Sequence, residues 1–265
     1  MRRALLIILA LVVHAVPAAA QITNFSRDVN SSIDLGLAWL DQAGAFRNPS
    51  ASGNAAGLTA LALLEKRESA DLRSHPRGYR NALPADRNRL DQVMPFIIAR
   101  SRNAGFYAYR DGADTMAMAV YLLTGGPDQA GALASIRATF DRMINNQGGH
   151  GYWCYSNGGC QDSSTTQLTM AGLAAARAVF INPGFRDDAR VQRLNVAVAR
   201  NCQRYASAAR AICTPTNAAT ATTRLRAQLA SRPPGAVVPD HRGRRHQQRL
   251  RPGLPAVAVQ PLPLR

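Results

Sequence analysis

Three segments of the chain repeat one plan, and this repetition constrains the fold more than any other feature. Each segment has a first helix, a loop that joins a glycine to an aromatic residue, and a second, alanine-rich helix that follows a small polar residue. The expected first helices span 29–40, 88–100 and 132–144, and a fourth runs from 186 to about 205. Matching positions recur roughly 50 to 60 residues apart, a period typical of helical-hairpin repeats.

The second helix of each repeat is expected to begin at a polar residue that caps it. Asn54, Asp114 and Ser164 stand at these positions, and their side chains are suited to accept hydrogen bonds from free N–H groups. In the fourth repeat the cap falls on the opening helix, where Asp187 or Asp188 also suits the positive end of the helix dipole.

The two kinds of helix differ in polarity. The second helices are apolar on almost every side, which predicts burial, whereas the first of the opening helices gathers Ile33, Leu37 and Leu40 on one face. An inner layer of apolar helices inside an outer layer of amphipathic ones predicts an all-α fold, a partial α/α toroid of hairpin repeats. A closed toroid of this type needs about a dozen helices, and the sequence offers about seven.

The two ends of the chain differ from the repeats. Residues 1–20 have the basic start, the apolar stretch and the small-residue cleavage site of a secretory signal peptide, with an uncleaved anchor helix as the alternative. We therefore expect an exported protein, periplasmic or extracellular, with its repeat domain at 21–214. Residues 215–265 are rich in Arg and Pro, which indicates either a disordered basic tail or a stretch read out of frame.

The formal net charge of +16 is concentrated in that tail, where about half of the excess lies. Lys66 is the only lysine in the chain, and so strong an arginine bias indicates a GC-rich genome, so the charge does not predict specific nucleic-acid binding. It leaves open contact of the tail with polyanions or with a membrane surface.

Four cysteines fall into two close pairs, and export into an oxidising compartment favours disulfides. Three connectivities exist, of which we favour Cys154–Cys160 and Cys202–Cys213 because each closes a short loop. A zinc site is the rival interpretation, but no C-x-x-C occurs, and we predict neither a metal nor a cofactor.

The third repeat carries a specific motif, Gln147-Gly148-Gly149-His150-Gly151-Tyr152-Trp153, which matches Q-x-x-x-G-x-W. It resembles the QW motif of squalene-hopene and oxidosqualene cyclases, whose superfamily includes the protein prenyltransferase β subunits. The resemblance covers about residues 28–205 and is weak in the first two repeats. It implies an α/α toroid in which the Gln147 amide ties helix ends together and Trp153 packs beside it.

The catalytic parts of these families have no counterpart in the sequence. The acidic D-x-D-D motif of the cyclases is missing, and the order and spacing of Cys160, Asp162 and His150 do not match the zinc ligands of the prenyltransferases.

Seven residues remain as candidates for a pocket at the end of the toroid where inner helices begin. Asp114 and Asp162 are candidates for a carboxylate pair that cleaves glycans, or for helix caps. His150 is either a base or a spacer in a glycine-rich loop. The remaining candidates for ligand contact are Tyr109, Tyr152, Trp153 and Tyr155, with packing as the alternative for Trp153.

Three functions remain open at this point. The first is a non-catalytic binding or structural module, with an unidentified ligand or protein partner and oligomerisation if the toroid is incomplete. The second is a glycan-acting hydrolase or lyase, and the third is polyanion binding through the tail.

Overall fold

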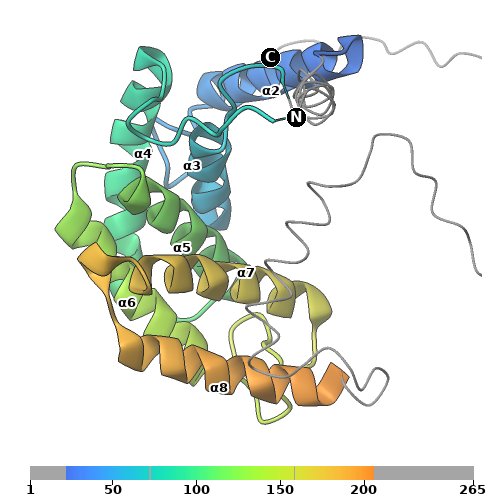
Figure 1. The fold of residues 1–265 in the computed structure, drawn as a ribbon, viewed down its shortest axis with the longest axis vertical. Coiled ribbons are helices and arrows are strands. Elements are labelled where there is room, and N and C mark those ends of the chain that lie inside the picture. Colours follow the sequence, from blue (N-terminus) through green and yellow to red (C-terminus); the bar gives the residue numbers. More distant parts are fainter. Residues whose placement is uncertain (1–21, 72, 158, 206–265) are drawn as a thin grey trace, which may run out of the picture. The chain divides into compact units, whose positions relative to one another are not determined.

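A computed structural model describes residues 22–71, 73–157 and 159–205 of the chain, and in this part the fold is all-helical (Figure 1). No strand occurs among these residues, which contain two isolated β-bridges, Arg67 with Pro76 and Trp153 with Asp162. The helices in chain order are α2 (Asn24–Gln42), α3 (Ala56–Leu64), α4 (Pro84–Asn103), α5 (Ala108–Leu123), α6 (Gln129–Asn145), α7 (Ser163–Phe180) and α8 (Asp188–Tyr205), with short 3₁₀ turns at Gly53–Ala55 and Pro183–Phe185.

The helices pack in two alternating series. Helix α5 lies between α3 and α7, and α6 lies between α4 and α8 (Figure 1). Each first helix also contacts the second helix of its own repeat, α2 with α3, α4 with α5 and α6 with α7. The predicted division into apolar second helices and amphipathic first helices therefore corresponds to two packed layers.

The closest helix contact joins α5 and α7 through two glycines. A Cβ atom placed on Gly172 would lie 2.7 Å from the Cα atom of Gly112, and one placed on Gly112 would collide with the main-chain oxygen of Leu168. Because neither residue has a side chain, the two helix backbones can approach at this point. Helix α5 is buried over most of its length as a result.

Three of the predicted caps are wrong. Asn54 lies within the 3₁₀ turn before α3, and no side chain caps that helix. Helix α5 begins at Ala108, so Asp114 lies inside it. Ser164 is in the first turn of α7, whose cap is Asp162.

The cap on the fourth repeat is confirmed for one of its two candidates. The Asp187 carboxylate accepts a hydrogen bond from the main-chain N–H of Arg190 at 3.2 Å. Asp188 is the first residue of α8 and forms an exposed ion pair with Arg186.

Helix α2 only partly follows its predicted buried face. Leu37 is buried and Leu40 is partly buried against the core, but Ile33 is 43% exposed, which corrects its assignment to that face. Phe25 and Trp39 are more exposed still. Among the described helices, α2 packs mainly on α3, and Arg89 of α4 forms an ion pair with Asp41 near its end. Less of its surface is therefore covered than in a central helix such as α5.

The predicted signal peptide, the tail at 215–265 and Cys213 lie outside the described residues. Within the described part, none of the helices combines the length and the apolar character needed to cross a bilayer.

Candidate functional site

The loop between α6 and α7 is held to α8 by an amide side chain. Gln147 Nε2 donates to the main-chain oxygens of Gly151, at 3.0 Å, and of Ala197, at 2.9 Å. Asn201 Nδ2 also donates to the Gly151 oxygen, at 2.7 Å. Gly151 has a φ of +81°, and a Cβ atom there would lie 2.6 Å from the main-chain oxygen of Arg200, so only glycine fits.

Trp153 anchors the same loop from inside the core. Its side chain is fully buried, and its indole Nε1 donates to the main-chain oxygen of Met143 at 2.7 Å. Its main-chain N–H donates to Thr166 Oγ1, and its main-chain oxygen accepts from Thr165 Oγ1. A ring enclosed in this way cannot stack on a ligand, which corrects the assignment of Trp153 to ligand contact.

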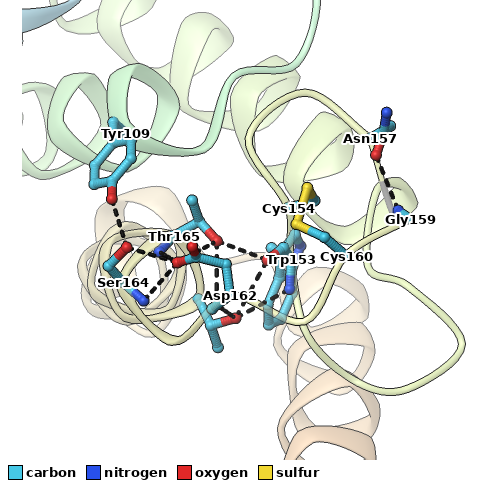
Figure 2. The surroundings of a disulfide bond; sticks show 10 residues. Tyr109, Trp153, Cys154, Asn157, Gly159, Cys160, Asp162, Ser164 and Thr165 are labelled. Carbon is cyan, nitrogen blue, oxygen red and sulfur yellow. Dashed lines mark hydrogen bonds between the residues drawn. A yellow bond between two sulfur atoms is a disulfide. The ribbon is translucent and has the colours of Figure 1, made fainter.

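Asp162 caps α7 and is partly exposed at the helix start (Figure 2). Its Oδ1 accepts hydrogen bonds from the main-chain N–H groups of Ser164, at 2.8 Å, and Thr165, at 2.9 Å, and from Ser164 Oγ at 2.6 Å. These bonds, with that from the Ser164 hydroxyl foremost, lower the pKa of Asp162 below its ordinary value. The group is therefore an ionised cap at neutral pH and not a proton donor.

A disulfide joins Cys154 to Cys160, which confirms that predicted pair (Figure 2). The bond closes a small loop just inside the β-bridge between Trp153 and Asp162. Within the loop, the main-chain oxygen of Tyr155 accepts a hydrogen bond at 2.8 Å from the main-chain N–H of Ala108, the first residue of α5. The loop thereby contacts the starts of two inner helices.

The predicted second disulfide involves Cys202 on α8 and Cys213. Because Cys213 lies outside the described residues, this pairing stays a prediction.

Three tyrosines lie together where this loop meets α5. The ring centroid of Tyr109 is 6.2 Å from that of Tyr107 and 5.6 Å from that of Tyr155. Tyr155 is 44% exposed, and the hydroxyls of Tyr109 and Ser164 lie 2.5 Å apart (Figure 2). The pKa of the Tyr155 phenol is raised, and the main cause is the hydrogen bond between Tyr155 and Tyr109. We call Tyr107, Tyr109 and Tyr155 the tyrosine surface.

Asp114 is placed differently from Asp162. It is fully buried, and Arg100 Nη2 lies 2.7 and 2.8 Å from its two carboxylate oxygens, with Ser101 Oγ at 3.2 Å from Oδ2. Burial raises its pKa to about 6, although Arg100 and Ser101 oppose the rise. Because both oxygens are engaged inside the helix layers, Asp114 is not an accessible partner for Asp162, and no catalytic carboxylate pair is formed.

The sequence reasoning missed a second buried carboxylate, Asp111, one turn earlier on α5. Arg110 and Arg142 each lie 2.8 Å from its oxygens. Two aspartates three positions apart on an otherwise apolar helix were the available signal, since buried charges require partners.

His150 and Tyr152 lie in the turn around Gly151. His150 is exposed and Tyr152 is half-buried, and the Tyr152 main-chain oxygen accepts from Gly148 at 2.8 Å. Over the described ranges, no group of three His, Cys, Asp or Glu side chains is arranged to hold a metal ion.

Comparison with known proteins gives no relative. No family model matches the chain, and neither the curated proteins nor the solved structures contain a significant match.

Proposed function

We propose that the chain is an exported, non-catalytic helical-repeat module that binds oligosaccharide on the tyrosine surface. In this proposal its repeats form part of an α/α toroid like that of the cyclases and prenyltransferases. The observation that carries the proposal is the tyrosine surface itself, in which the exposed Tyr155 ring and the half-buried Tyr107 and Tyr109 are held in place by the disulfide loop and by the start of α5.

The contacts of Gln147 and Trp153 support the toroid part of the proposal. In the QW motif the amide ties helix ends together and the tryptophan packs beside it. Here the Gln147 amide joins the end of α6 to α8, and the buried Trp153 indole binds the last turn of α6. The disulfide supports export, because such bonds persist in oxidising compartments.

A sugar ring suits the tyrosine surface for two reasons. Tyrosine rings present apolar faces with a polar hydroxyl, the combination that an amphipathic pyranose ring requires. The neighbouring Ser164 hydroxyl and Asp162 carboxylate add polar groups at the same helix start. The carboxylates with catalytic potential serve instead as a helix cap and as a buried ion pair, so the surface supports binding without cleavage.

The test is a calorimetric titration of the full chain with neutral oligosaccharides of glucose, mannose and N-acetylglucosamine, which measures the affinity for each. We expect one of them to bind, and Tyr155→Ala to weaken its binding by about tenfold, as expected for a lost aromatic contact of 1–2 kcal/mol. The matched control is Trp39→Ala, which removes an aromatic ring that is 65% exposed on α2.

Binding that is equally weakened by both substitutions would contradict the assignment of the site. Binding of none of the sugars by the wild-type chain would contradict the proposed function. Release of reducing ends during the incubation would contradict the non-catalytic assignment.

A further inference from the structure

An open pocket lies at the other end of α5 from the tyrosine surface. Its volume is about 270 Å³, and its lining consists of Pro76, Arg77, Arg80, Asn81, Leu123 and Thr124. The 16 residues of α5 separate it from the tyrosine surface by about 24 Å at the usual helical rise. Two sites at these ends would therefore be independent.

Arg77 is fixed in the wall of this pocket by two of its five N–H donors. Its Nη2 donates to the main-chain oxygen of Glu68 at 2.9 Å, and its Nη1 donates to that of Asn81 at 3.4 Å. Its Nε is buried and has no hydrogen-bond partner. Because Nε is enclosed, a ligand in the pocket would contact the remaining N–H groups of Nη1 and Nη2.

Arg80 adds a second cation to the same pocket. The main-chain N–H of Arg80 donates to the main-chain oxygen of Thr124 at 3.2 Å. The Arg80 guanidinium lies over Gly125, and a Cβ atom added to that glycine would be 2.8 Å from Nη2. Among the described residues, no carboxylate forms an ion pair with Arg77 or Arg80. Arg100, Arg142 and Arg190, in contrast, are all paired with aspartates.

Interaction with the end of α5 does not account for these two cations. Arginines are favourable near a helix C-terminus because the last carbonyls are partly negative. Here the main-chain N–H groups of Thr124, Gly125 and Gly126 already bind the carbonyls of Val120, Leu122 and Tyr121. The Arg77 guanidinium donates to Glu68 and Asn81, and within the described residues neither guanidinium donates to a carbonyl of α5.

We propose that this pocket binds a phosphate group, either free or as the monoester of a small molecule. Two guanidinium groups match the geometry and charge of a tetrahedral oxyanion, and the Asn81 amide lies in the same lining. The pocket volume exceeds that of one oxyanion, so it has room for part of an attached sugar or alcohol. This site does not depend on the proposed function of the tyrosine surface.

The test is calorimetric titration of the full chain with inorganic phosphate and with a hexose phosphate. We expect wild-type binding that weakens with added salt, and Arg80→Gln to reduce the affinity by about tenfold, the effect of one charge-assisted contact. The matched control is Arg47→Gln. Arg47 is an exposed arginine on another loop, and it donates a hydrogen bond to the main-chain oxygen of Asp41. The control should bind as the wild type does, and so should Tyr155→Ala.

The two ligands distinguish the sources of the phosphate. Tighter binding of the hexose phosphate supports a monoester, and equal binding supports the free ion. Equal weakening by Arg80→Gln and Arg47→Gln would indicate unspecific attraction to a basic chain and overturn the proposal. Lack of binding of both ligands to the wild type would overturn it as well. Arg77→Gln, checked for folding by its thermal melt, provides a second variant and should lose the same binding.

Discussion

Gln147 Nε2 donates a hydrogen bond at 2.9 Å to the main-chain oxygen of Ala197, a residue 50 positions later in the chain. This bond joins two successive repeats, because Gln147 follows α6 and Ala197 lies on α8. Ala197 is buried, and because it lies inside α8 its oxygen also accepts the helical hydrogen bond, so the Gln147 amide is a second donor to the same atom.

Gln147→Ala should lower the free energy of unfolding by about 1–3 kcal/mol, the net contribution of the two hydrogen bonds that its amide donates to Gly151 and Ala197. The measurement is urea denaturation followed by circular dichroism. Gln167→Ala on α7 is the control, since Gln167 is exposed, and it should change stability by less than about 0.5 kcal/mol. Equal effects would show that the bond to Ala197 contributes nothing.

Gly151→Ala should destabilise the fold by about 1–3 kcal/mol, because an alanine there is strained at a φ of +81° and collides with α8 at Arg200 and Asn201. Gly149→Ala serves as the control two residues earlier. A Cβ atom on Gly149 would meet nothing within 4 Å, and its φ is not positive. A thermal melt that is lowered in both variants would contradict the steric account.

Replacement of Cys154 and Cys160 together by serine should lower the free energy of unfolding by about 2 kcal/mol, as expected for opening a short closed loop. The same change should weaken oligosaccharide binding, because the loop no longer holds Tyr155 against Tyr109. Paired denaturation and titration experiments measure the two effects. A variant that loses stability but keeps full affinity would show that the disulfide does not support the tyrosine surface.

Asp114 predicts a specific pH dependence of stability. Its pKa is raised from the ordinary value of 3.8 to about 6 in the folded chain, so between these values the folded state binds a proton that the unfolded state does not. The contribution of Asp114 to the free energy of unfolding is therefore greatest below pH 3.8 and falls as the pH rises through about 6.

Asp114→Asn should remove this decline, because an amide does not titrate. Relative to the wild type, the variant should lose more stability at pH 4 than at pH 7, because only the wild type gains stability from protonation of Asp114 at low pH. Denaturation at several pH values between 4 and 7 gives both quantities. An unchanged pH profile in the variant would assign the titration to another group.

Only part of the candidate site was predictable from the sequence. The Cys154–Cys160 pair was predicted correctly because a short separation in the chain limits the geometry of the loop. The caps predicted at Asn54 and Ser164 were wrong because the helices begin a few residues away from the expected positions. The cap predicted at Asp114 was wrong because a polar residue at a helix start and one buried beside an arginine look alike in sequence. The partnership of Asp114 with Arg100 depends on the packing of α4 against α5, which no local pattern encodes.

The sequence by itself determined the helices, their alternation in polarity and the local disulfide, because all three depend on residues close together in the chain. Only the tertiary structure decided that Trp153 is enclosed, that Asp111 and Asp114 are neutralised by arginines from other helices, and that Tyr109 and Tyr155 lie together. These outcomes depend on contacts between segments far apart in the chain. Burial and the proximity of charged groups are properties of that packing, and they decide which polar residues are structural and which remain exposed for binding.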